Sequence, residues 1–238
     1  MMIDGVLNLN KPQGITSRQA LDRIRKLWGV KKAGHGGTLD PDATGVLPIC
    51  LGKATKLFDP LQEGTKSYSA TVTLGITTDT FDASGQVLMT SPTEHISEDQ
   101  IDFVLNSFVG EIDQTVPIFS AVKYQGKPLY KLARQGKQIE NLPSRQVTIK
   151  SIEITLMNLP KFAFKVDCSK GTYIRSLVND VGTQLKCGAI LSQLVRTRSG
   201  IFRLEDAYDL DSLEERKITS NESVVPMNVV IEALKQVV

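Results

Sequence analysis

The chain has 238 residues, of which 41% are apolar, so it can bury one sizeable core in one or two domains. Its formal net charge of +2, taken over the whole chain, gives little reason to expect a polyanionic partner. The three cysteines, Cys50, Cys168 and Cys187, are odd in number and far apart, which excludes a disulfide framework and a CxxC metal or redox pair.

The first predicted elements lead into a glycine-rich segment. Apolar alternation predicts a short strand over residues 6–10. Thr16 or Ser17 can cap a helix with apolar residues on one face, and Gly29 ends that helix. The sequence GHGGTLDPDATG, residues 34–45, follows as a loop.

The middle of the chain carries the clearest strand and helix signals. Residues 67–76 alternate strictly between polar and apolar side chains, which predicts a strand with one packed face and one wet face. Ser97 and Gln100 form a capping box at the start of a helix, and we expect Gly110 to stop it.

The remaining predicted elements follow a basic segment, about residues 114–146, that interrupts the strand pattern. In chain order they are strands over 147–156 and 162–168, a helix over 173–185, a strand through the 190s and a helical tail from about 209. Strands outnumber helices without regular βαβ alternation. The predicted fold is therefore α+β, with a mainly antiparallel mixed sheet flanked by helices.

The segment around Asp40 allows several interpretations. It lacks the spacing of a phosphate-binding P-loop, and a calcium loop starting at Asp40 would need an acid where Leu51 stands. Asp40, Asp42 and Thr44 match the DxDxT pattern and so resemble the magnesium-dependent haloacid-dehalogenase phosphotransferases. Those enzymes have a hydrophobic strand before the first Asp, whereas AGHGGTL stands here. A structural turn is the remaining alternative.

Five separated motifs resemble one known family, the TruB family of bacterial tRNA pseudouridine-55 synthases. In chain order they are LNKPQGITS with Lys11, GHGGTLDPDATGVLPICLGKATK with Asp40, KSYSATVTLGITTDTFDASG with Tyr68, FSAVKYQGKPLYKLARQG after Phe119, and CSKGTYIRSLVNDVG with Arg175. They extend from residue 6 to about residue 200, in the order of the family.

The resemblance implies roles for single residues. Asp40 is the nucleophile and pairs with Arg175. His35 occupies the space that the target nucleotide leaves in the T-loop, and Tyr68 lies against the flipped base. The partner is the T-arm of tRNA, and the family needs neither a metal nor an organic cofactor.

The resemblance also implies a pocket and a domain plan. Tyr173 and Leu194 line the uridine pocket. Lys11, from its own place before Pro12, is a candidate to support the active-site loop, although a lone lysine is usually solvated surface. Residues 1–238 form one catalytic domain with the pseudouridine synthase fold, an RNA-clamp insertion at about 114–146 and a short helical extension at about 209–238. We expect the small C-terminal RNA-binding domain of longer relatives to be missing.

Three positions depart from the family pattern. Gly36 stands where Thr is common, Asp42 where an apolar residue is usual, and Val116 where QxPP has its first Pro. These changes leave Asp40 in place, so we expect them to affect RNA affinity rather than chemistry.

The proposed reaction explains why these residue types are needed. Breaking the C1'–N1 bond and forming C1'–C5 requires a captive uracil, and a carboxylate can assist by attacking the sugar or by removing a sugar proton. Either role needs an ionised carboxylate in a closed pocket, and a cation such as Arg175 would hold Asp40 in its charged form. Pro41 keeps Asp40 out of the helical region. The Tyr68 hydroxyl is a possible base for the C5 proton, although Tyr68 would equally suit a core and Arg175 a structural ion pair.

The charges are segregated along the chain. Residues 11–34 and 115–150 each hold seven Lys or Arg and one acid, whereas residues 79–113 hold eight acids and no Lys or Arg. This indicates one face for phosphates, unless the charges are merely solvated. We expect lysines and tyrosines of the insertion to form a mobile RNA clamp, with the residues Lys123, Tyr124, Lys127, Tyr130, Lys131, Arg134 and Lys137.

Three hypotheses remain: the synthase, a magnesium-dependent phosphotransferase, and a tRNA-binding or folding factor without chemistry. Asp4 precedes the first apolar stretch and no apolar run approaches the ~20 residues of a membrane span, so we expect a cytoplasmic protein with no membrane partner. Only two histidines are present, so no His cluster binds a metal. A monomer is expected, because the substrate is asymmetric.

Overall fold

The computed structural model describes residues 3–137, 139 and 141–236, so residues 138 and 140 of the expected insertion and the last two residues of the expected extension lie outside it. The chain forms two compact units. Unit 1 comprises Met1–Ser69 and Leu194–Val238, and unit 2 comprises Ala70–Gln193. Two strands run from one unit into the other, β4 (Lys66–Leu74) and β12 (Ala189–Ser199). The expected division into catalytic domain, insertion and extension stays a prediction.

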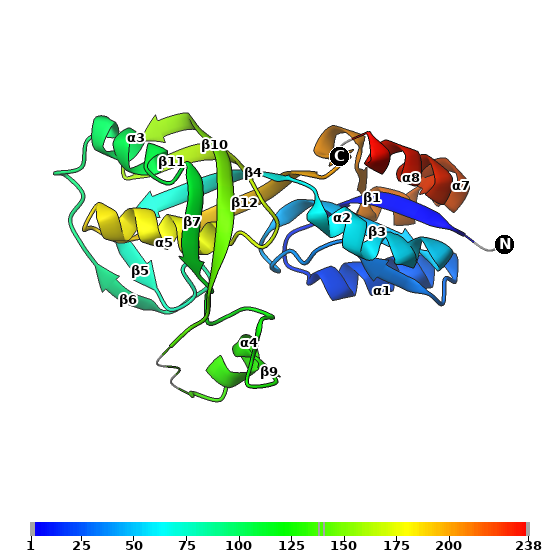
Figure 1. The fold of residues 1–238 in the computed structure, drawn as a ribbon, viewed down its shortest axis with the longest axis horizontal. Helices are drawn as coiled ribbons and strands as arrows, with labels where there is room; N and C mark the ends of the chain where they lie inside the picture. Colours follow the sequence, from blue (N-terminus) through cyan, green and yellow to red (C-terminus); the bar gives the residue numbers. More distant parts are fainter. Residues whose placement is uncertain (1–2, 138, 140, 237–238) are drawn as a thin grey trace. The chain divides into compact units, whose positions relative to one another are not determined.

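Unit 1 is built on strands with the order β14-β1-β3-β12, and β15, β2 and β13 pair with β1, β3 and β12. Helices α1 and α8 lie on opposite sides of β1 and β3 (Figure 1). The elements are β1 (Gly5–Lys11), α1 (Ser17–Trp28), β2 (Ala33–His35), β3 (Thr44–Leu51), the 3-10 helix η1 (Gly52–Leu57), α2 (Phe58–Glu63), β13 (Phe202–Arg203), the 3-10 helix η2 (Leu204–Asp206), β14 (Tyr208–Asp209), α6 (Leu210–Glu215), α7 (Ser220–Ser223), β15 (Val224–Pro226) and α8 (Met227–Lys235).

The core of unit 1 joins the start of the chain to its C-terminal part. Val6 of β1, Val46 of β3 and Val230 of α8 are fully buried in one cluster with η1 and α2. Burial of apolar side chains is the main favourable term in folding, so this cluster holds the strands that lead into the loop around Asp40. The predicted helix after residue 16 is confirmed, with Thr16 as its N-cap and Gly29 in the left-handed region as its C-cap.

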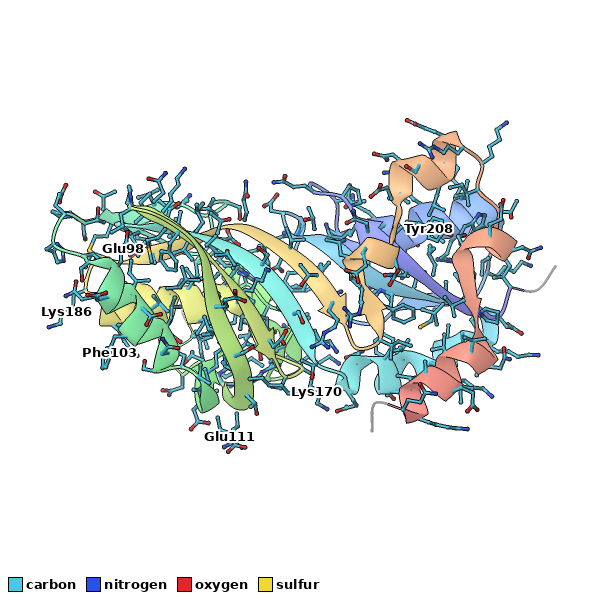
Figure 2. The ribbon with its side chains drawn as sticks, turned by 90° about the horizontal axis from the view of Figure 1, so that it is seen from above. Glu98, Phe103, Glu111, Lys170, Lys186 and Tyr208 are labelled. Atoms are coloured by element: carbon cyan, nitrogen blue, oxygen red, sulfur yellow. The ribbon has the colours of Figure 1, made fainter. Side chains whose placement is uncertain are left out.

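Unit 2 is built on strands with the order β12-β4-β11-β10-β7, and α3 packs against α5 and β10. Phe103 of α3 points away from this packing and is 77% exposed (Figure 2). Its elements are β5 (Ile76–Thr78), β6 (Val87–Thr90), α3 (Glu98–Asn106), β7 (Gly110–Thr115), β8 (Lys123–Tyr124), β9 (Lys127–Pro128), α4 (Leu129–Ala133), β10 (Ser144–Asn158), β11 (Lys161–Cys168) and α5 (Ile174–Gln184).

The predicted fold class is confirmed, since the fold is α+β with a mixed sheet flanked by helices. Two boundaries were wrong. The helix with the Ser97 capping box ends at Asn106 and is capped by Ser107, whereas Gly110 has φ +117° and begins β7. The strand expected to reach residue 76 ends at Leu74, because Gly75 with φ +82° turns the chain into the separate hairpin of β5 and β6.

The tail was also only partly helical. The chain from residue 209 contains α6, α7 and α8, but β14 and β15 add two short strands beside β1. The pairing of Val6 with Val225 and of Leu9 with Tyr208 ties the tail to the first strand. Strands of two or three residues are too short to show alternation and have no sequence signal of their own, because pairing partners supply their stability.

Candidate active site

The loop that carries Asp40 connects β2 to β3 in unit 1. Its backbone turns directly after Asp40, because the Ala43 N–H donates to the Asp40 carbonyl at 3.2 Å, with Pro41 at the second position of the turn. The Pro41 carbonyl in turn accepts hydrogen bonds from the Gly14 N–H at 2.9 Å and from Lys11 Nζ at 3.0 Å. The segment between β1 and α1 therefore holds the chain just beyond Asp40.

The residue before Asp40 is held as firmly. The Ser17 hydroxyl donates to the Leu39 carbonyl at 2.9 Å, and the Leu39 N–H donates to Ser17 Oγ at 2.8 Å. Ser17 and Leu39 are both buried. Residues 38–40 belong to no helix or strand, so these contacts replace the ladder that would otherwise fix the backbone.

Lys11 is the buried cation of this loop. Its side chain is fully buried, and Nζ donates to the carbonyls of Pro12, Ile15 and Pro41. Desolvation lowers the pKa of Lys11 to about 8, and the carboxylates of Asp42 and Asp40 oppose this shift. At pH 7 the ammonium group therefore keeps its proton and provides all three donors. The sequence predicted that Lys11 supports the active-site loop. Its hydrogen bond to the Pro41 carbonyl is the contact through which it would do so, and the role stays a prediction.

Arg196 of β12 is a second buried cation that sequence reasoning missed. Its Nε donates to the Val46 carbonyl at 2.7 Å, and one terminal nitrogen donates to the Gly37 carbonyl at 3.2 Å. Arg196 thus fixes the glycine-rich end of the loop. The only sequence signal is its place on a strand, where a charged residue ordinarily points to solvent.

Gly45 permits the close approach of the strands at this point. Gly45 belongs to β3, where it pairs with Lys11 of β1 on one side and with Arg196 of β12 on the other. With φ +99°, a Cβ atom on Gly45 would lie 2.3 Å from the Arg196 carbonyl oxygen. Only glycine fits such a position, because other residues are strained there and the opposing group is backbone.

His35 is the last residue of β2 and pairs with Ile49 of β3. Burial lowers its pKa, and the cations Arg196 and Arg18 add to the effect. The imidazole is therefore neutral at pH 7. Its Nδ1 is buried and has no hydrogen-bond partner within the described part of the chain. A buried, neutral His35 ring is suited to packing and to RNA recognition rather than to proton transfer.

Tyr68 and Leu194 are the other predicted site residues of unit 1. Tyr68 lies on β4 on the face that alternation predicted to be packed, and it is 9% exposed. Leu194 lies on β12 and is half-buried. The residue after it, Val195, pairs with Thr44 at the end of the Asp40 loop. The register of β12 therefore brings Leu194 close to the start of β3.

Arg175 belongs to unit 2, in the first turn of α5, and is 4% exposed. Its two terminal nitrogens each donate at 3.0 Å, one to the Thr80 carbonyl and the other to the Phe119 carbonyl. Its Nε lies 3.7 Å from Asp82 Oδ2. These contacts use the planar shape of the guanidinium group, which a lysine could not reproduce.

Asp82 is a functional candidate that sequence reasoning missed. Besides its contact with Arg175, its Oδ1 accepts hydrogen bonds from the Thr80 hydroxyl and from both the N–H and the hydroxyl of Ser84. The acid thus orders the loop between β5 and β6 and faces the guanidinium group. The motif TDTFDASG contained the signal, because Asp followed two residues later by Ser is typical of an Asx-turn.

Tyr173 is the N-cap of α5, and Gln114 of β7 holds its backbone from both sides. The Gln114 side chain donates to the Tyr173 carbonyl at 3.0 Å and accepts from its N–H at 2.7 Å. The Arg145 guanidinium group stacks over the Tyr173 ring, 5.2 Å from its centroid. Gln114 is 1% exposed and was not predicted.

The three positions that depart from the family pattern have different surroundings. A Cβ atom on Gly36 would meet the Leu61 and Pro48 Cβ atoms at 3.5 Å, which is ordinary contact, so the space there does not require glycine in place of alanine. Val116 donates its N–H to the Pro143 carbonyl at 2.9 Å, a bond that proline could not make. Asp42 is exposed in the turn after Asp40.

The expected clamp residues lie on the hairpin of β8 and β9 and around α4. Gln125 and Gly126 both have positive φ, as a tight two-residue hairpin requires, and Leu129 and Leu132 are buried. Arg134 stacks on the Tyr130 ring at 5.7 Å. Tyr124, Lys127 and Lys137 help to line a cavity of about 490 Å³. Lys123, Lys127, Lys131 and Lys137 are exposed.

The basic stretch at residues 11–34 is less available to phosphates than its composition suggested. Lys11 is buried, and the three arginines of the stretch form ion pairs with acids. Arg18 and Arg25 pair with Asp22, and Arg23 pairs with Asp211 and Glu214. The last two acids lie about 190 residues away on α6, so sequence counting could not reveal this neutralisation.

The described part of the chain shows neither a metal-binding cluster nor a helix suited to a membrane. No group of three or more His, Cys, Asp or Glu side chains there is placed to hold a metal ion. None of its helices combines the length and the apolar character that crossing a membrane would demand.

Comparison with known proteins gives consistent matches. A family model described as TruB family pseudouridylate synthase (N terminal domain) matches residues 25–174, and one described as tRNA pseudouridylate synthase B C-terminal domain matches residues 175–238. The tRNA pseudouridine synthase B of Clostridium novyi (strain NT) is 49% identical, over 89% of this chain and 72% of the relative. That of Geobacillus kaustophilus (strain HTA426) is 48% identical, over 90% and 77%.

The fold is also similar to a solved structure. A chain in the crystal structure of a Cbf5-Nop10-Gar1 complex is 33% identical, with a TM-score of 0.74 over 97% of this chain. This chain spans 62% of the length of that one.

Proposed function

The chain belongs to the TruB family of pseudouridylate synthases, and from this premise we propose that it isomerises the uridine at position 55 in the T-loop of tRNA to pseudouridine. The observation that carries the proposal is the fixed backbone around Asp40. Hydrogen bonds from Ser17, Lys11 and Gly14 hold the residues on both sides of this carboxylate. A nucleophile needs such a constant aim, because misplacement by about 1 Å can cost about 100-fold in rate.

We propose that Asp40 assists cleavage of the C1'–N1 bond and that the bond is re-formed as C1'–C5 after the uracil rotates. Arg175 is proposed to pair with the Asp40 carboxylate and to stabilise its negative charge in the closed pocket. Tyr68, Tyr173 and Leu194 are proposed to line the pocket of the flipped uridine. The Tyr68 hydroxyl is proposed to accept the proton that leaves C5.

Neither alternative function has comparable support. A phosphotransferase of the DxDxT type needs a strand that runs directly into its nucleophile, but β2 ends at His35, five residues before Asp40. A binding factor without chemistry would not need a carboxylate held on both flanks. The synthase is therefore the function that the geometry supports best.

We also propose that the protein acts as a monomer in the cytoplasm, because one L-shaped tRNA does not call for a symmetric pair of sites. Light scattering at micromolar concentration, with and without a T-arm stem-loop, tests this. A complex of two chains per RNA would contradict it.

Removing metal separates the synthase from the phosphotransferase. In excess EDTA, the protein is expected to convert a T-arm stem-loop fully, because none of the proposed steps uses a metal ion. The measurement is release of tritium from uridine labelled at C5, since that hydrogen leaves when C1'–C5 forms. A stem-loop with cytidine at the target position is the control. Absence of product with metal and without it would contradict the proposed function.

The clamp proposal predicts steep salt dependence. Log affinity for the stem-loop should fall linearly with log salt concentration, by a slope of about 0.7–0.9 per phosphate neutralised. Replacing Lys123, Lys127 and Lys131 together by Gln should make the slope shallower by about 2 to 3 if each lysine neutralises one phosphate. Lys235→Gln is the control, since this lysine pairs with Glu232 on α8. Equal slopes for the triple variant and the control would show that the clamp does not contact phosphates.

A further inference from the structure

Two neighbouring hydroxyl residues, Thr16 and Ser17, stand where α1 begins, and the structure gives them different tasks. Thr16 is the N-cap and forms the capping box with Gln19. The helix therefore does not need the Ser17 hydroxyl. That hydroxyl points instead to Leu39, 22 residues further along the chain, with which it makes two hydrogen bonds.

We propose that Ser17 is a positioning residue for Asp40, an inference that rests on the proposed function. One hydroxyl binds the N–H and the carbonyl of Leu39, at 2.8 and 2.9 Å. The Leu39 carbonyl belongs to the peptide group whose nitrogen is that of Asp40. Because peptide groups are planar, a fixed Leu39 carbonyl also fixes the orientation of the Asp40 nitrogen and Cα. The Asp40 side chain projects from that Cα.

The contact is shielded from water and lies directly before the nucleophile. Ser17 is 2% exposed and Leu39 is 4% exposed, so water cannot take over either hydrogen bond without a rearrangement. On the other side of Asp40, the Pro41 carbonyl is held by Lys11 and Gly14. Ser17 supplies the corresponding restraint on the near side. Without it, the peptide group before Asp40 could rotate while the turn after it stayed in place.

The test compares variants of two buried serines in unit 1. Ser17→Ala removes both bonds to Leu39. Ser223→Ala is the matched control, because Ser223 is 4% exposed and its hydroxyl also donates to a backbone carbonyl, that of Thr219 at 2.9 Å. Each 238-residue variant is assayed in single turnover, with enzyme in excess over a T-arm stem-loop labelled with tritium at C5. RNA affinity and melting temperature are measured for the same samples.

The expected result is a rate that falls by about 10- to 100-fold for Ser17→Ala, with RNA affinity within about twofold of the unaltered protein. The melting temperature should fall by no more than it does for Ser223→Ala. Ser17→Thr keeps the hydroxyl and should recover most of the rate. Ser17→Cys keeps the size but has a weaker donor and should give an intermediate rate; it replaces Ser17→Ala if that variant fails to fold.

A purely structural role would produce a different pattern. If Ser17→Ala, or Ser17→Cys in its place, keeps the full single-turnover rate, the inference is overturned. It is equally overturned if the rate loss disappears once the unfolded fraction is subtracted. Failure of the proposed function looks different, because the unaltered protein would then release no tritium at all.

Discussion

Asp40→Asn is expected to form no detectable pseudouridine in a T-arm stem-loop while binding the RNA with nearly unchanged affinity. The amide has almost the same shape as the carboxylate but is a poor nucleophile and base at neutral pH, so the single-turnover rate should fall by more than about 10⁴-fold. The backbone contacts of Leu39 and Pro41 do not involve the side chain, so the fold should persist. Tritium release and filter binding measure the two quantities.

Asp42→Asn is the matched control for this variant. Both carboxylates lie in the same turn and both raise the pKa of Lys11, so each substitution removes one negative charge from the same surroundings. The rate of Asp42→Asn should stay within about threefold of the unaltered protein. If Asp40→Asn still modifies RNA, or if Asp42→Asn loses as much activity, Asp40 is not the nucleophile.

Gly45→Ala is expected to have the largest effect on stability. Its Cβ atom would lie 2.3 Å from the Arg196 carbonyl oxygen and 2.9 Å from the Arg196 nitrogen, at a residue with φ +99°. Backbone strain and the displacement of β12 from β3 should together lower the free energy of unfolding by about 3–5 kcal/mol. Urea denaturation monitored by circular dichroism measures this change.

Gly36→Ala, in the loop that leads into β3, serves as the comparison. Its Cβ atom would meet its nearest neighbours at 3.5 Å, so the free energy of unfolding should change by less than about 1 kcal/mol. Equal stabilities for the two alanine variants would mean that β3 and β12 can separate without cost at this point.

The parts of the fold that follow from local chemistry could be predicted from sequence. The capping boxes at Thr16 and Ser97 and the alternation in β4 each depend on residues within a few positions of one another. The short strands β14 and β15 could not, because they exist only as partners of β1, which lies about 200 residues earlier.

The site shows the same division. The motifs indicated Asp40, Arg175 and Tyr68, but they did not indicate what holds these residues. Ser17, Arg196 and Gln114 act through hydrogen bonds to backbone groups that are distant in sequence, and such contacts leave no periodic pattern. The roles carried over from the family for Arg175, Tyr173 and Leu194 stay predictions that variants at these positions can test.

The hydrogen bonds of Ser17 to Leu39 and of Gln114 to Tyr173 share one design. In each, a single side chain makes hydrogen bonds with both the N–H and the carbonyl of one residue. It therefore replaces, at that residue, the backbone hydrogen bonds that a neighbouring strand would supply. A real strand partner spreads its hold over many residues and survives most point mutations. These two anchors do not, so we expect one altered codon to slow the enzyme strongly in a chain that still folds and still binds the same RNA.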